Sequence, residues 1–253
     1  MKLQVLGCYG GSYRGRHLSC YLLNDTIALD AGSLTHALTY EQQTRVRHVI
    51  VSHSHLDHNC SLAFLIDNMF GIHDGPVEVY AIPPVIESLR THLFNDELWP
   101  DFTKLPSEDA PTLRFHEVHE ETPFEVDGLT FTPVRVNHIT PTVGFVIRDG
   151  KSAIIYTGDT GPTDRVWAVA NETANLKAVV AEASFPNAKG DLAATSGHLT
   201  PETLERELQK LNVKVKVLVT HVKPRWRAQI AKELRLIHSR RVELLQQNKT
   251  YRF

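Results

Sequence analysis

Six residues near position 55 constrain this chain more than any other stretch. The segment His53-Ser54-His55-Leu56-Asp57-His58 places four side chains that can bind a metal within six positions. It follows residues 47–52, whose apolar centre is typical of a buried strand, and precedes residues 61–66, which are typical of an apolar helix. The motif therefore lies where a core strand ends and a helix begins, a place where side chains converge on a pocket.

The spacing within this motif predicts two sets of ligands. Side chains alternate along an extended chain, so His53 and His55 point to the same side and suit one ion. Asp57 and His58 are adjacent and diverge, so they suit a second ion nearby. The alternative is a histidine-rich loop exposed to water, and the regular strand pattern before the motif argues against it.

Composition narrows the classes of protein. The chain has 253 residues, of which 42% are hydrophobic, enough to bury a large core. The net charge of -2 and the pI near 6.7 argue against a dedicated binder of long nucleic acid, but they allow a small phosphate-bearing substrate. The cysteines, Cys8, Cys20 and Cys60, are odd in number and widely spaced, which indicates reduced thiols in a cytoplasmic protein. No stretch is long enough to cross a membrane, and the apolar segment before Cys8 is too short for a signal peptide.

The rest of the chain is predicted to alternate between strands and helices. We expect strands at residues 2–7, 18–23, 26–29, 77–81, 112–118, 129–136, 143–148, 153–157, 178–182 and 213–220. We expect helices at residues 34–43, 84–93, 163–171, 201–210 and 226–247. No low-complexity linker separates the two groups of strands. This order predicts one α/β domain over residues 1–253, an αββα sandwich of two mixed β-sheets face to face with helices outside.

Three further potential ligands stand at the ends of predicted strands. His138 follows residues 129–136, Asp159 follows residues 153–157, and His221 follows residues 213–220. A lone histidine is a weak signal, but each gains weight beside the motif at position 53. Nitrogen and carboxylate ligands of this kind suit zinc, with manganese or iron as alternatives. Asp30, at another strand end, is expected either to orient a metal ligand or to serve as a turn or helix-cap residue.

Taken together, these residues resemble the metallo-β-lactamase superfamily of binuclear metallohydrolases. The resemblance rests on residues 53–58, Asp30, His138, Gly158-Asp159-Thr160 and Thr220-His221, and it covers nearly the whole chain. It implies two divalent metal ions. One would be held by His53, His55 and His138. The other would be held by Asp57, His58 and His221, with Asp159 bridging the two.

A narrower resemblance points to a substrate. Phe94-Asn95, residues 99–102, residues 182–187 and residues 197–201 are similar to the class II 3',5'-cyclic-nucleotide phosphodiesterases. This implies hydrolysis of cAMP or cGMP to the 5'-monophosphate by a metal-bridged hydroxide. Asn59 and the helix residues that follow it depart from that family's pattern, which bears on the substrate more than on the chemistry.

Two alternatives to this function stay open. The residues around Glu182 and His198 also resemble the RNA-processing phosphodiesterases of the superfamily, so RNA ends or another phosphodiester are an alternative substrate. A metal-binding sensor without catalysis is the second alternative, and the presence of every expected ligand type argues against it.

The resemblance also assigns catalytic roles. Asp57 is expected to ligate metal and orient the hydroxide. His198 is expected to stabilise the phosphate or protonate the leaving 3'-oxygen, with Glu182 holding its ring, and a structural histidine at a helix start is the alternative. A homodimer is implied by resemblance alone. The aromatic insert around Trp99 is expected either to cover the site or to cap the core.

Overall fold

Two seven-stranded mixed sheets form the centre of the molecule. The computed structural model describes residues 1–253. The first sheet has the order β16 (Thr250–Arg252), β1 (Lys2–Gly7), β2 (Cys20–Leu23), β3 (Ile27–Ala31), β4 (His48–Ile50), β5 (Val77–Ala81), β8 (Leu113–Glu117). The second has the order β15 (Val242–Leu244), β14 (Lys216–Thr220), β13 (Leu176–Glu182), β12 (Ala153–Tyr156), β11 (Val143–Arg148), β10 (Leu129–Arg135), β9 (Phe124–Val126). A small hairpin, β6 (Pro106–Ser107) and β7 (Ala110–Pro111), stands apart from both.

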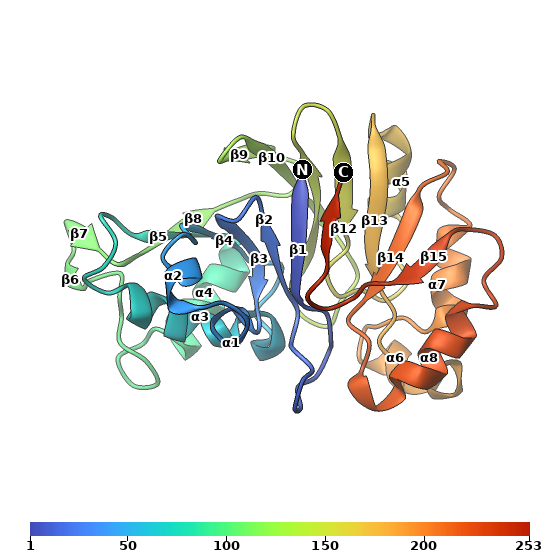
Figure 1. The fold of residues 1–253 in the computed structure, drawn as a ribbon, viewed down its shortest axis with the longest axis horizontal. Helices are drawn as coiled ribbons and strands as arrows, with labels where there is room; N and C mark the ends of the chain where they lie inside the picture. Colours follow the sequence, from blue (N-terminus) through green and yellow to red (C-terminus); the bar gives the residue numbers. More distant parts are fainter.

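Eight α-helices flank the sheets in two groups (Figure 1). The first sheet is accompanied by α1 (Leu34–Ala37), α2 (Tyr40–Gln43), α3 (Leu56–Met69) and α4 (Pro83–His92). The second is accompanied by α5 (Arg165–Glu172), α6 (Gly190–Thr195), α7 (Pro201–Leu208) and α8 (Arg227–Leu234), with short 3-10 turns at Asn187–Lys189 and Pro224–Trp226. No helix is long and apolar enough to cross a membrane. The expected αββα sandwich is confirmed.

Strand β11 shows how the sequence builds this layered core. Phe145 and Ile147 belong to the larger apolar cluster, which draws side chains from both sheets. Val146 points the other way, into a second cluster that includes Trp167 of α5 and Leu204 of α7. Because both faces of the sheet are buried, the strand is apolar throughout rather than alternating.

The parallel strands determine where a site can form. In the first sheet β3, β4, β5 and β8 run parallel, and in the second β12, β13, β14 and β15 do so. Ligands in α/β sheets bind outside the carboxyl ends of parallel strands. The loops that leave β4, β12, β13 and β14 therefore converge at one edge of the sandwich.

Two predicted helices are wrong. Residues 226–247 form α8 only as far as Leu234, and Val242–Leu244 instead extends the second sheet as β15, with Val217 of β14 paired to Val242. Pairing with the sheet outweighs the helical propensity of this segment. Residues 34–43 form two short helices, because Thr39 stops the first and caps the second through a capping box with Gln42.

The sequence analysis also missed the short strands β6, β7, β9 and β16 and the helix α6. The aromatic insert caps the core: Phe94 is buried, Trp99 packs edge to face on Phe64 of α3 at 5.3 Å, and both join the larger cluster.

Candidate metal centre

Both sheets contribute to one cluster of histidines and aspartates. The first sheet supplies His53 and His55 in the segment after β4, and Asp57 and His58 in the first turn of α3. The second sheet supplies the remaining three, each just after a strand: His138 after β10, Asp159 after β12 and His221 after β14. The structure thus brings together all seven residues singled out in the sequence.

The ligand atoms form two groups. Those of His53, His55, His138 and Asp159 lie within 4.8 Å of one another, and so do those of Asp57, His58 and His221. Asp159 lies between the groups: its Oδ2 is 3.2 Å from Nε2 of both His58 and His221, and 3.7 Å from Nε2 of His53. Asp159 therefore lies at the junction of the two groups.

Two buried imidazole nitrogens indicate that the cluster suits a metal. His53 and His58 are fully buried, and Nε2 of each has no hydrogen-bond partner. A buried polar atom without a partner costs about 1–3 kcal/mol, so such atoms are rare unless a ligand completes them. Both nitrogens face Asp159. The donor set of imidazoles and carboxylates is suited to divalent metal ions.

Burial and charge set the protonation of the ligands. Burial holds the pKa of His53 well below its usual range, so the ring is neutral. Burial alone would raise the pKa of the Asp159 carboxyl, but the charges of His221 and His58 outweigh burial and hold this pKa well below its usual range. A neutral imidazole and an ionised carboxylate are the forms that coordinate a metal.

Asp30 orients the ligand segment at residues 53–58 through hydrogen bonds to Ser52 and His58. This fully buried residue lies at the end of β3 with φ +54°, a conformation that Asp tolerates better than most residues. Its carboxylate accepts hydrogen bonds from the Ser52 backbone N–H (2.8 Å), the Ser52 hydroxyl (2.9 Å), His58 Nδ1 (2.7 Å) and the Tyr156 hydroxyl (2.7 Å). The bond to Nδ1 directs Nε2 of His58 into the cluster. Of the two roles expected for Asp30, the structure has the orienting one.

Glu182 and His198 form a second buried pair beside the cluster. Glu182 ends β13, and its Oε1 is 2.6 Å from Nδ1 of His198, which lies in the loop between α6 and α7. Glu182 also accepts from the backbone N–H groups of Thr160 and Ser184. The His198 ring stacks on His221, with centroids 5.3 Å apart and an interplanar angle of 19°. His198 therefore borders the ligand groups, and its side-chain nitrogen lies within 4.8 Å of the ligand atoms of Asp159 and His221.

Two glycines let backbone approach the cluster closely. A Cβ on Gly10 would lie 2.5 Å from the His221 ring. Gly197 has φ +68°, and a Cβ there would lie 2.9 Å from Nδ1 of His138, which bonds the Gly197 carbonyl at 2.8 Å. The sequence analysis did not predict the approach of Gly10 to His221. It included Ser184 in the resembling stretch 182–187 but did not predict that the Ser184 hydroxyl lies 2.8 Å from Nδ1 of His221.

Comparison with known proteins identifies the family. The family described as "Beta-lactamase superfamily domain" matches residues 25–221, a span that contains every residue of the cluster. This chain belongs to the β-lactamase superfamily. The superfamily fold explains why ligands from two sheets meet at one edge.

Two curated members of the superfamily are similar along most of the chain. The "Probable 3',5'-cyclic-nucleotide phosphodiesterase" of Yersinia pestis is 27% identical, over 87% of this chain and 77% of its own length. The "3',5'-cyclic-nucleotide phosphodiesterase 1" of Saccharomyces cerevisiae is 29% identical, over 73% of this chain and 58% of its own length. The segment aligned by sequence thus covers less than two thirds of the yeast protein.

A solved superfamily structure agrees in fold. The crystal structure of unliganded yeast PDE1 superposes with a TM-score of 0.83 at 20% identity, and the match covers 98% of each chain. At this identity the likeness establishes the fold alone.

Proposed function

We propose that this protein is a metal-dependent phosphodiesterase that hydrolyses 3',5'-cyclic nucleotides, cAMP or cGMP, to 5'-monophosphates. The observation that carries the proposal is the Glu182–His198 pair, set against two ligand groups that share Asp159. A phosphodiester needs both a cationic centre and a proton donor for its leaving oxygen, and this edge of the sandwich offers both. The names of the Yersinia and yeast relatives support the same substrate.

The proposed metal content is two divalent ions, zinc in preference to manganese or iron, because the ligands are imidazoles and carboxylates. His53, His55 and His138 would hold one ion, and Asp57, His58 and His221 the other, with Asp159 shared. When bound, such a pair neutralises charge on a phosphoryl group and acidifies water for attack on phosphorus. The neutral His53 ring and the ionised Asp159 carboxylate leave the chain ready for such ions.

Asp57 is the proposed orienting group for the attacking water. Its carboxylate is half-buried, whereas His58, Asp159 and His221 are buried, so it is the carboxylate of the cluster nearest to solvent. Its Oδ2 lies 3.2 Å from Nε2 of His221. A carboxylate in this position can orient the attacking water by accepting a hydrogen bond from it.

His198 is the proposed proton donor to the leaving 3'-oxygen. Burial lowers the proton affinity of this ring, but the Glu182 carboxylate outweighs burial and raises the pKa of His198. Because Nδ1 is held by Glu182, Nε2 is the nitrogen left to face a substrate. Glu182 is thus a positioning residue that keeps the ring protonated and oriented.

The test is hydrolysis of cAMP and cGMP by purified protein of measured metal content, beside the metal-stripped protein and a bis-aryl phosphodiester. The expected result is metal-dependent turnover of a cyclic nucleotide with the 5'-monophosphate as product. If the protein cleaves the aryl diester but neither cyclic nucleotide, the proposal that its substrate is a cyclic nucleotide is overturned. RNA with mature or extended 3' ends would then be assayed. No turnover by protein that holds two ions would overturn the enzymatic proposal.

Two further predictions accompany this function. We propose that residues 1–253 act as one domain, since the larger apolar cluster joins both sheets. A homodimer is also predicted, and light scattering on the purified protein checks it.

A further inference from the structure

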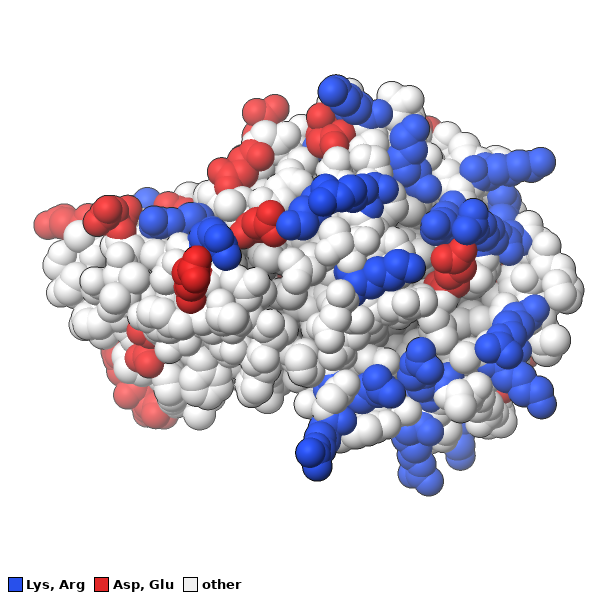
Figure 2. Space-filling model, viewed as in Figure 1, with Lys and Arg blue, Asp and Glu red and all other residues white.

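Charge is distributed unevenly along this chain. Residues 211–253 contain 11 Lys and Arg but only 2 Asp and Glu, whereas residues 1–210 contain 16 Lys and Arg and 27 Asp and Glu. The net charge of -2 conceals this asymmetry. Figure 2 shows the result: Lys and Arg gather over the half of the molecule that holds β14, β15 and α8, while acidic side chains predominate at the opposite end.

The cations of this C-terminal segment form few ion pairs. Of its 11 Lys and Arg, only Arg241 forms an ion pair, at 2.8 Å with Glu243. Elsewhere ion pairs are common, as between Arg114 and Glu78 or between Arg165 and Glu121. Most of the positive charge of residues 211–253 is therefore not neutralised within the chain.

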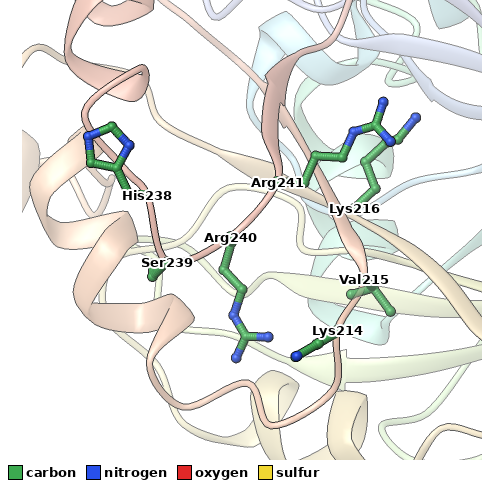
Figure 3. Close-up of a pocket in the computed structure, with 7 residues that line it drawn as sticks. All are labelled: Lys214, Val215, Lys216, His238, Ser239, Arg240 and Arg241. Atoms are coloured by element: carbon green, nitrogen blue, oxygen red, sulfur yellow. The ribbon is translucent and has the colours of Figure 1, made fainter.

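A shallow depression of about 450 Å³ lies at the centre of this surface (Figure 3). We define the C-terminal basic face by the polar residues around it: Lys214, Lys216, His238, Ser239, Arg240 and Arg241. The face combines four permanent cations with an imidazole and a hydroxyl, and no carboxylate lines the depression. It belongs to the outer edge of the second sheet and does not include any residue of the candidate metal centre.

The backbone places like charges side by side on this face. Lys216 lies on β14 directly before Val217, whose N–H donates to the carbonyl of Arg241 on the neighbouring segment, and the two side chains project together in Figure 3. The Arg240 guanidinium donates to the carbonyls of Val213 and Leu211, which fixes it near Lys214. Like charges on neighbouring strands are destabilising unless an anion lies between them.

We propose that the C-terminal basic face binds the phosphate backbone of a nucleic-acid strand without reading its sequence. Repeated phosphates match a group of neighbouring cations of which only Arg241 has an ion-pair partner, and such binding is driven by release of counterions. A membrane surface fits less well, because surface helices also insert apolar side chains and Leu236 is the single large apolar residue exposed in residues 211–253. The overall net charge had argued against a nucleic-acid partner; the separation of charge reverses that argument.

The test is fluorescence anisotropy of a labelled single-stranded RNA of mixed sequence across a series of salt concentrations. The variant Lys214→Glu/Lys216→Glu removes two cations and places carboxylates beside Arg240 and Arg241. It should melt at or above the temperature of the wild type, because two repulsive pairs become attractive. Its affinity for RNA should fall about tenfold or more, and the slope of log K against log salt should become shallower by about 1.4.

The control variant Arg45→Glu/Arg90→Glu makes the same change in net charge at exposed positions beside the first sheet that form no ion pair. It should retain most of the affinity for RNA, and both variants should hydrolyse the phosphodiester substrate at the wild-type rate. The proposal is overturned if the wild type does not bind RNA, or if both variants lose affinity equally. Binding to vesicles of phosphatidylserine without binding to RNA would overturn it in favour of a membrane surface.

Discussion

His198 touches two parts of the site at once. Its Nδ1 is held by Glu182, and its ring stacks on the proposed metal ligand His221. Because its ligand-capable atom lies within 4.8 Å of those of Asp159 and His221, metal binding and proton donation are both within its geometry. A carboxylate on Nδ1 is compatible with either role, since Asp30 holds Nδ1 of the proposed ligand His58 in the same way.

Replacement of His198 by alanine separates these roles. We expect His198→Ala to lower kcat about 10²–10⁴-fold, the usual worth of general acid–base catalysis, while two metal ions remain bound. Metal content is measured by inductively coupled plasma mass spectrometry beside the kinetic assay. His92→Ala, at the exposed last residue of α4, is the control and should change neither turnover nor metal content. Loss of one metal ion from His198→Ala would make this residue a ligand and remove it from the proposed chemistry.

Asp30 acts on the metal centre without belonging to it. In Asp30→Asn an amide N–H₂ replaces one carboxylate oxygen, which in the wild type accepts hydrogen bonds from Ser52, His58 or Tyr156. The amide donates rather than accepts, so those hydrogen bonds are lost. We expect metal affinity to fall about 10–100-fold, as it does when partners of ligating histidines are lost. Competition with a chromophoric chelator measures it. Asp127→Asn is the control, because Asp127 also has positive φ (45°) but lies at the surface. Equal affinities in the two variants would contradict the orienting role.

At this scale the sequence reveals ligands better than it reveals their supports. His138 and His221 could be found because each follows an apolar strand. Tyr156 could not, because it meets Asp30 across 126 residues of chain and nothing in its local sequence marks the contact. Such a role arises only when the two sheets pack together.

Among the elements, α7 begins with a side-chain cap. The Thr200 hydroxyl accepts from the Thr203 N–H at 3.2 Å, the Thr203 hydroxyl accepts from the Thr200 N–H at 2.7 Å, and Pro201 occupies the first turn. This start also fixes the end of the loop that carries His198. The cap therefore links the stability of a helix to the position of a proposed catalytic group.

Removal of this cap should destabilise the protein. We expect Thr200→Ala to lower the free energy of unfolding by about 1 kcal/mol, the typical worth of an N-cap side chain. Urea denaturation of the metal-loaded protein measures the change. Thr195→Ala, which loses an exposed hydroxyl bonded only to the Asp191 carbonyl of its own helix, should stay within about 0.5 kcal/mol of the wild type. A loss of the same size at both positions would contradict the capping argument.

Local pattern predicted elements well where the pattern and the packing agree. The strand at residues 143–148 was expected and found, because this short apolar run is buried on both faces of a sheet, as its pattern predicted. The segment after Leu234 was expected to be helical and is not. Its conformation depends on the free edge of β14, to which Val242–Leu244 pairs. The residues of the segment alone do not show that this edge is free.

For the whole molecule, the position of the metal centre has a consequence for stability. One sheet supplies His53, His55, Asp57 and His58, and the other supplies His138, Asp159 and His221. Bound ions would therefore link the two sheets at the edge where their loops meet. The unfolded chain does not hold these ligands together, so metal affinity adds to the stability of the fold.

Metal removal should accordingly lower the melting temperature. At free metal about 100-fold above the dissociation constant, one site contributes about 2.7 kcal/mol, so addition of a chelator should shift Tm by several degrees. Differential scanning fluorimetry with and without the chelator measures the shift. Asp159→Asn weakens a ligand that both groups share and should abolish most of the shift. Asp164→Asn changes an exposed carboxyl nearby in the sequence and should retain it.

The comparison of these two variants distinguishes a link between sheets from a site that forms within one sheet. If the ions tie the sheets together, loss of Asp159 removes the ligand on which both groups depend, and the chelator then has little left to remove. If each ion were held by the first sheet alone, through His53, His55, Asp57 and His58, the Asp159→Asn protein would keep the full shift. A retained shift would therefore contradict the proposed ligand sets even if the enzyme were active.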